Sequence, residues 1–236
     1  MSKILVLGDT HGRPFWKEII EKENPDKIIF LGDYVSTHEG ISAEQQLSNL
    51  EEILTYKGSN PDKVILLRGN HDTQHLGYYW AECSGWNGQV WNVMAQPEFK
   101  ERFLKLTQWV YIDEELKTIF SHAGVSDVWM KNSGIDSVHD INSLEPSELF
   151  GFTPNYYGDC YGDSETQPPV WIRPQTLCKC NIEEWNQVVG HTPVQKGIYH
   201  THNTIGQSEI WFCDALGVKQ YLVIDNNKFQ PKTFEQ

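Results

Sequence analysis

The chain has few basic residues. Its 19 Lys and Arg residues stand against 32 Asp and Glu residues in a length of 236, so the formal net charge is −13. Such an acidic chain disfavours binding to extended nucleic acid or to an anionic membrane, because both attract positive charge. A single polyanionic substrate stays open, since bound cations can reverse the local sign of charge at a site.

Long hydrophobic runs are also missing. No apolar stretch approaches the roughly 18 residues that a membrane-spanning helix needs. The first apolar run, 3–7, is shorter than the core of a secretion signal, and no cleavage site follows it. We therefore expect no membrane partner and a cytoplasmic protein.

The cysteines show no disulfide framework. They are odd in number and irregularly spaced: Cys83, Cys160, Cys178, Cys180 and Cys213. This pattern favours reduced thiols over disulfides. Cys178 and Cys180 lack a second Cys/His pair at zinc-site spacing, so the sequence favours structural or incidental thiols there.

Apolar runs and helical segments alternate in the first third of the chain. We expect strands over 3–7, 27–31 and 63–67, and helices over 14–23 and 42–56. Strand, helix, strand, helix, strand predicts a parallel βαβαβ unit with right-handed crossovers. The strands are almost continuously apolar, which indicates that both of their faces are covered.

Further strands follow in the second half of the chain. They are expected at 109–113, 117–121, 187–192, 209–214 and 220–225. We expect a single domain over 1–236 with a loop-rich insertion around 125–170 on the substrate side. Tyr156, Tyr157 and Tyr161 in that insertion could line the substrate mouth.

Polar residues stand where the strands end. The motifs are Gly8-Asp9-Thr10-His11-Gly12, Gly32-Asp33, Gly69-Asn70-His71-Asp72, Ser121-His122-Ala123-Gly124 and Gly190-His191-Thr192. Ligands bind beyond the carboxyl ends of parallel strands. Strands lie roughly 4.8 Å apart, and paired catalytic metals roughly 3.5–4 Å apart. Ligands on neighbouring strand ends can therefore bind the same two ions. The glycine before each ligand allows the backbone to turn sharply there.

Each motif alone has an ordinary explanation, because a Gly-Asp pair is most often a turn and a lone histidine most often a satisfied polar residue. Together the five motifs resemble those of the calcineurin-like metallophosphoesterases. They are most similar to the branch of the serine/threonine phosphoprotein phosphatases, phage phosphatases and symmetrical dinucleoside-tetraphosphatases. The resemblance spans 8–192 and implies an α/β fold, a sandwich of two mixed sheets flanked by helices.

The resemblance also implies two metal ions, with manganese expected and iron, zinc, nickel or cobalt as alternatives. The implied metal ligands are Asp9, His11, Asp33, Asn70, His122 and His191. In this scheme Asp9 and His11 bind the first ion, Asp33 bridges both, and the other three complete the second. A hydroxide between the ions attacks phosphorus directly. His71 acts as the general acid, with Asp72 orienting its ring.

The second motif departs from the family pattern. The phosphatase branch usually reads GDYVDRG, where the arginine clamps phosphate, but this chain has Ser36 and Thr37 in place of that Asp and Arg. One phosphate clamp is therefore missing or supplied from elsewhere. We expect Arg173 to replace it in catalysis and substrate binding, with Arg13 as a second substrate-binding candidate.

Three functions remain open at this stage. The first is a metal-dependent phosphomonoesterase, acting on a phosphorylated protein or a small phosphate ester. The second is a pyrophosphohydrolase or phosphodiesterase acting on dinucleoside polyphosphates or nucleic-acid ends, which the missing clamp favours. The third is a binding scaffold without catalysis, which the intact set of expected ligands disfavours.

Overall fold

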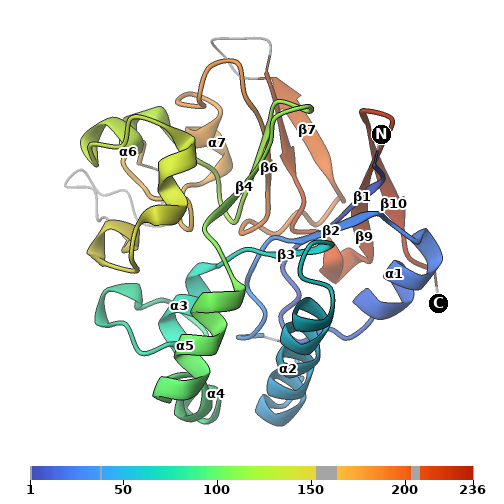
Figure 1. The fold of residues 1–236 in the computed structure, drawn as a ribbon, viewed down its shortest axis with the longest axis vertical. Coiled ribbons are helices and arrows are strands. Elements are labelled where there is room, and N and C mark those ends of the chain that lie inside the picture. The colour runs from blue at the N-terminus through green and yellow to red at the C-terminus, as the bar shows by residue number, and fades with distance from the viewer. Residues whose placement is uncertain (1, 38, 153–163, 203–207, 236) are drawn as a thin grey trace.

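Two five-stranded mixed sheets form the centre of the molecule, and helices cover their outer faces (Figure 1). The computed structural model describes residues 2–37, 39–152, 164–202 and 208–235. The α/β sandwich expected from the motifs is thereby confirmed. No helix in the described ranges is long and apolar enough to cross a membrane.

The first sheet has the order β10-β9-β1-β2-β3. Its strands are β1 (Ile4–Leu7), β2 (Lys27–Phe30), β3 (Val64–Leu66), β9 (Gln220–Asp225) and β10 (Lys228–Thr233). β1, β2 and β3 are parallel, as predicted, and β9 runs antiparallel to β1. The crossovers are α1 (Trp16–Glu23) and α2 (Ala43–Ser59). The hydroxyl of Ser42 accepts a hydrogen bond from the Gln45 backbone N–H, which fixes the start of α2.

The second sheet has the order β4-β5-β6-β8-β7. Its strands are β4 (Val110–Asp113), β5 (Thr118–Ser121), β6 (Asn186–Val189), β7 (Tyr199–His202) and β8 (Glu209–Phe212). β4 and β5 pair antiparallel as a hairpin, while β5, β6 and β8 run parallel. The carboxyl ends of these three strands therefore meet at one edge of the sheet.

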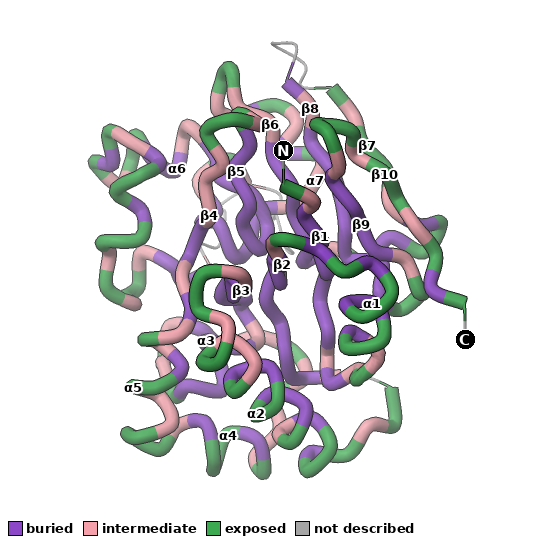
Figure 2. Tube along the Cα trace, turned by 45° about the vertical axis from the view of Figure 1, so that its right-hand side comes forward, coloured by how far each residue is buried: buried purple, intermediate pink, exposed green. Residues whose placement is uncertain are grey.

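Alternate residues of the strands enter different parts of the core. Ile4 and Val6 of β1 join a cluster between the sheets that includes Phe120 and Trp211. The next residues along β1 face α1, α2, α4 (Gly88–Met94) and α5 (Pro97–Leu106). Figure 2 shows the central strands buried over most of their length, whereas the edge strands β7 and β10 are largely exposed. Burying one large aliphatic side chain contributes roughly 1.5–3 kcal/mol, so this core holds the strand ends in place.

Short helices occupy part of the region expected to be loop-rich. They are α6 (Asp127–Asn132), η2 (Val138–Ser143) and η3 (Glu148–Phe150), and α7 (Pro174–Leu177) follows just beyond it. Phe150 stacks on Trp109 with ring centroids 3.7 Å apart, which attaches the segment to the second sheet. Tyr156, Tyr157 and Tyr161 lie outside the described residues. The remaining short helices are α3 (Asn70–His75), η1 (Tyr79–Ala81) and η4 (Leu216–Val218).

Candidate metal centre

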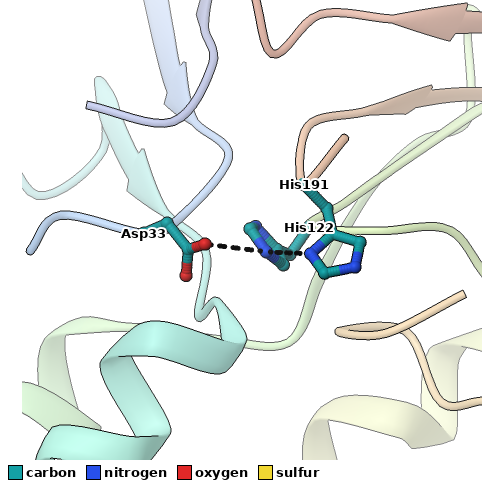
Figure 3. Close-up of side chains that lie close together, drawn as sticks. All are labelled: Asp33, His122 and His191. Atoms are coloured by element: carbon teal, nitrogen blue, oxygen red, sulfur yellow. Dashed lines mark hydrogen bonds and ion pairs between the residues drawn. The ribbon is translucent and has the colours of Figure 1, made fainter. Parts of the chain in front are cut away.

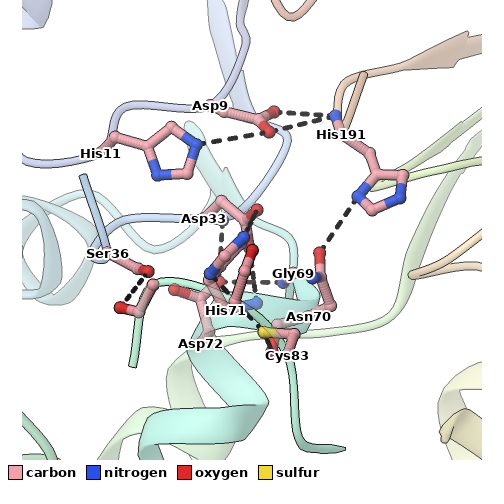
Figure 4. A network of polar contacts seen from close by, with 12 residues as sticks. Asp9, His11, Asp33, Ser36, Gly69, Asn70, His71, Asp72, Cys83 and His191 are labelled. Carbon is pink, nitrogen blue, oxygen red and sulfur yellow. Dashed lines mark hydrogen bonds and ion pairs between the residues drawn. The ribbon is translucent and has the colours of Figure 1, made fainter. Parts of the chain in front are cut away.

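The predicted ligands come together at the rim where the strands of both sheets end (Figure 4). Ligand atoms of Asp33, His122 and His191 all lie within 4.8 Å of one another, and the same holds for Asp9, His11 and Asp33. Asp33 belongs to both groups. Its position is therefore the one that a carboxylate bridging two cations requires.

The three histidines in these groups share one arrangement. Each has one ring nitrogen hydrogen-bonded to a backbone carbonyl: His11 Nδ1 to Val35 (2.9 Å), His122 Nδ1 to Leu31 (2.8 Å) and His191 Nε2 to Trp171 (3.2 Å). Because a carbonyl oxygen only accepts, that ring nitrogen carries the hydrogen. The other ring nitrogen of a neutral imidazole then has a free lone pair. This arrangement is the usual one for a histidine that binds a metal.

Acceptor atoms crowd against one another around Asn70. The Asn70 Oδ1 atom lies 3.0 Å from His122 Nε2 and 3.1 Å from His191 Nδ1, and the two ring nitrogens are 3.2 Å apart. His122 Nε2 is also 3.3 Å from Asp33 Oδ2 (Figure 3). Lone pairs this close repel unless a proton or a cation lies between them. Nitrogen and oxygen donors without thiolate suit manganese, iron or zinc, so the residues fit the expected ions.

Asp33 and His122 form the electrostatic centre of the site. Burial by itself would raise the pKa of Asp33, but the imidazoles of His122 and His71 hold it far below its usual range. Burial would likewise lower the pKa of His122, but Asp33 and Asp9 raise it to about 10. Positive charge is therefore favoured where these acceptors meet, and a metal cation would provide it.

Two glycines make room for ligands that follow other strands. A Cβ atom on Gly69 would lie 2.0 Å from Asp33 Oδ1, and one on Gly190 would lie 2.2 Å from Asp9 Oδ1. The sequence predicted that each glycine allows a sharp backbone turn where a side chain would crowd the site. The turn is found at Gly32, whose φ is +103°. At Gly69 and Gly190, glycine is required because a carboxylate lies too close to the backbone for any side chain to fit.

Backbone strain accompanies the site. His11, Asp33 and His191 have φ angles of 45°, 52° and 63°, in the left-handed region that side chains rarely adopt. Such conformations cost on the order of 1–3 kcal/mol each and concentrate at functional sites. The His11 backbone N–H donates to the Asp33 carbonyl at 2.9 Å, so the two strained segments hold each other.

Asp72 does not orient the ring of His71, and that prediction is wrong. The Asp72 carboxylate accepts hydrogen bonds from the backbone N–H groups of Asp33, Tyr34 and Gly69, each at 2.9 Å. The Gly69 N–H precedes α3, and the first N–H groups of a helix have no partner within the helix. The other two N–H groups belong to the loop after β2. Asp72 therefore fixes the loop that carries Asp33.

The ring of His71 lies between the metal centre and a thiol. Its Nε2 atom is 4.0 Å from Asp33 Oδ2, and its Nδ1 atom is 3.6 Å from Cys83 Sγ. Burial lowers the pKa of His71 to about 4. Cys83 was not expected here, because it lies outside every motif and only the fold brings it near.

Arg13 and Arg173 both line a pocket of about 730 Å³ in front of the centre, together with His71 and Asp33. Arg173 donates from Nη1 to Thr192 Oγ1 at 3.1 Å. Both arginines can thus present positive charge to a bound phosphate, and their contact with substrate remains a prediction.

Glu39 already engages one of these arginines. Arg13 is ion-paired with Glu39 and also donates to the backbone carbonyl of Asp9 at 3.2 Å. Ser36, in place of the family aspartate, donates its hydroxyl to the Gly85 carbonyl at 2.7 Å. The loop that departs from the family motif therefore contributes the Glu39 carboxylate, which restrains Arg13. No sequence motif predicts this contact.

Asp214 is a third residue near the site, after Cys83 and Glu39, that no motif predicted. It is 7% exposed and lines the same pocket as His11 and Asp33. It lies just after β8, so it shares the strand-end position of Asp9 and Asp33. That position was the signal that could have identified it.

A family model described as calcineurin-like phosphoesterase matches residues 2–223 of the chain. The chain is 26% identical over 169 residues to a symmetrical bis(5'-nucleosyl)-tetraphosphatase of Citrobacter koseri, covering 67% of this chain and 55% of that protein. It is 30% identical over 166 residues to a catalytic subunit of protein phosphatase 2A from Dictyostelium discoideum, covering 65% and 46%. The chain spans about half the length of these curated relatives.

Solved structures show the same fold. A cold-active protein-tyrosine phosphatase of a psychrophilic Shewanella species has a TM-score of 0.63 at 16% identity, covering 100% of this chain and 81% of that one. A protein serine/threonine phosphatase of Saccharomyces cerevisiae has a TM-score of 0.60 at 17% identity, covering 99% and 80%. At these identities the likeness concerns the fold alone.

Proposed function

The chain belongs to the calcineurin-like phosphoesterases, and on that premise we propose that it is a phosphomonoesterase working with two metal ions. The observation that carries the proposal is the shared arrangement of His11, His122 and His191, each with one ring nitrogen fixed by a carbonyl and the other turned to the centre. Two cations bound there would supply an acidified water for attack on phosphorus and positive charge for the phosphoryl oxygens.

We assign the residues as follows. Asp33 is shared by both ions, Asp9 and His11 hold one of them, and Asn70, His122 and His191 hold the other. Manganese is the first metal to test, with iron, zinc, nickel and cobalt as alternatives.

His71 and the two arginines act on the substrate in this proposal. His71 Nε2 faces the space next to Asp33, so a hydrogen on that nitrogen points toward a leaving oxygen bound there. Arg173 and Arg13 bind the phosphoryl oxygens from the pocket wall. The two arginines together replace the positive charge that the loop at Ser36 and Thr37 lacks. This charge supports a phosphate monoester, which is doubly negative, as the substrate.

A phosphoserine or phosphothreonine side chain is the first substrate candidate, because the relatives include a protein phosphatase catalytic subunit. A dinucleoside polyphosphate is the second, because other relatives are symmetrical tetraphosphatases. The pocket volume of about 730 Å³ and the aromatic residues Phe152 and Trp171 in its wall would also suit a nucleoside.

The test compares substrates on one preparation of the full chain loaded with manganese. p-Nitrophenyl phosphate, a phosphothreonine peptide and diadenosine tetraphosphate are assayed side by side, with Asp33→Asn as the inactive control. We expect the two monoesters to be hydrolysed faster than the tetraphosphate. Faster cleavage of the tetraphosphate would favour the second candidate, and no hydrolysis with any metal of the panel would refute both.

We also propose a reducing, cytoplasmic location. It is supported by Cys83, Cys180 and Cys213, which are unbridged thiols in the structure.

A further inference from the structure

Asp214 buries a carboxylate oxygen without a partner. The side chain lies just after β8 and is 7% exposed, and its Oδ2 atom is buried with no hydrogen-bond partner. A buried ionised carboxylate is unfavourable unless a hydrogen-bond donor or a cation compensates it. A compensating group is therefore expected at this position.

The neighbouring carboxylates are all engaged by the protein. Asp72 accepts three backbone hydrogen bonds, and Asp9 accepts one from the His191 N–H at 3.0 Å. Asp33 accepts from the His71 N–H at 3.0 Å and lies against His122. Across the described ranges, Asp214 Oδ2 is the one buried carboxylate oxygen left without a hydrogen bond.

Asp214 lies next to the first half of the metal centre. A Cβ atom on Gly8 would lie 2.1 Å from the Cys213 carbonyl oxygen and 3.1 Å from the Asp214 Cα atom, so the ends of β1 and β8 touch. Asp9 is the residue after Gly8. After burial itself, the charge of Asp214 is the strongest influence raising the pKa of Asp9. The carboxylates of Asp9 and Asp214 are therefore buried close to each other.

We propose that Asp214 is a supporting carboxylate beside the cation site formed by Asp9, His11 and Asp33, acting through a bound water because its oxygens lie outside that ligand group. This inference rests on the proposed metal-dependent function. The first site has two carboxylates and one imidazole as ligands with the Asp214 carboxylate behind them, while the second has two imidazoles, an amide and the shared Asp33. The first site is therefore the oxygen-rich one and suits a hard cation such as Mn²⁺, whereas the second suits zinc or iron.

The test measures Mn²⁺ binding to the metal-free full chain by calorimetry, without any substrate. Asp214→Asn should weaken one of two binding events by about 10–100-fold, the usual loss when a supporting group of a metal site is removed. Thermal unfolding gives an independent readout. Metal-free Asp214→Asn should melt no lower than the metal-free parent, because an uncompensated charge is gone, yet manganese should raise its melting temperature by less.

Glu23→Gln is the matched control. Glu23 is also a buried carboxylate, but it pairs with Lys3 and Lys232 away from the pocket. Its replacement should lower the melting temperature and leave both manganese affinities unchanged. If Asp214→Asn did not fold, Asp214→Glu would replace it, because moving the carboxylate by one methylene should still change the affinity of the first site.

Wild-type affinity at both sites in a folded Asp214→Asn protein would overturn the inference, as would a parent chain that binds no Mn²⁺. The outcome is separable from that of the proposed function. Phosphatase activity with unchanged binding in the variant would refute the role of Asp214 alone. Weakened binding in the variant of an inactive chain would refute the phosphatase proposal and leave Asp214 in the metal centre.

Discussion

The Nδ1 atom of His71 lies 3.6 Å from the Sγ atom of Cys83. The same sulfur is 4.0 Å from the backbone carbonyl oxygen of Asn70. Burial raises the pKa of Cys83 far above its usual range, so the thiol keeps its hydrogen and can point it at that carbonyl. In the doubly protonated ring that donation from Nε2 requires, the sulfur can accept from His71 Nδ1–H, although sulfur is a weak acceptor. Cys83 therefore has the contact with His71 that was expected of Asp72.

Cys83→Ala should reduce turnover most on substrates with poor leaving groups. Phenyl phosphate depends on a well-placed acid, whereas p-nitrophenol leaves with little protonation. We expect a loss of roughly threefold to tenfold on phenyl phosphate, a small part of the about 10²–10⁴ that an acid supplies. The loss on p-nitrophenyl phosphate should be smaller, and Cys83→Ser should recover most of the activity. Equal losses on both substrates would indicate a structural role only.

His71→Ala and Asp33→Ala should separate proton donation from metal binding. We expect His71→Ala to lower kcat by about 10²-fold or more while the bound metal stays near the parent level. Asp33→Ala should lower both, because its carboxylate belongs to both ligand groups. The metal content of each variant is measured by elemental analysis, and its kcat is measured by steady-state kinetics on the same preparation. Similar mild effects from the two changes would contradict the assignment.

Glu39→Gln should release Arg13 for phosphate. The ion pair between these side chains lies at the pocket, so a substrate dianion has to compete with the Glu39 carboxylate. We expect the KM for a monoester to fall several-fold in Glu39→Gln. Arg13→Ala should raise KM by about tenfold or more, since a hydrogen bond to a charged group contributes about 1.5–3 kcal/mol. Glu44→Gln, on an exposed position of α2, is the control. Unchanged KM values in both pocket variants would exclude Arg13 from substrate binding.

Glu23 should give the fold a stability component that disappears in acid. Its buried carboxylate meets Lys3 Nζ at 2.8 Å and Lys232 Nζ at 2.7 Å. Burial would raise the pKa of Glu23, but its hydrogen bonds with Lys232, Lys3 and Tyr221 lower it from 4.5 to about 2. Since the folded pKa lies below the unfolded one, the stabilisation is complete above about pH 4.5 and is lost as the pH falls toward 2.

Urea unfolding of Glu23→Gln at pH 7 and pH 3 tests this. The variant should be less stable than the parent at pH 7 by on the order of 2–3 kcal/mol. The difference should shrink at pH 3. Glu18→Gln, exposed on the same helix, should show little change at either pH. A difference that stays constant with pH would show that packing, and not charge, accounts for it.

The sequence by itself determined the strands and the residues at their ends. Apolar runs predicted β1, β2 and β3, and each run leads into glycine followed by a ligand type within the same few residues. Because parallel strands end at one edge of a sheet, this local order was enough to predict that Asp9, Asp33 and Asn70 meet. No long-range information was needed for that part of the site.

Only the tertiary structure decided which side chains support these ligands. Asp72 is next to His71 in sequence, yet its carboxylate binds the loop of Asp33, 39 residues away. Cys83 reaches His71 and Asp214 reaches the corner of Asp9 only after separate segments have packed together. Hydrogen bonds form over about 3 Å and depend on direction. Spacing along the chain cannot fix such distances between segments, whereas the packed sheets and helices do.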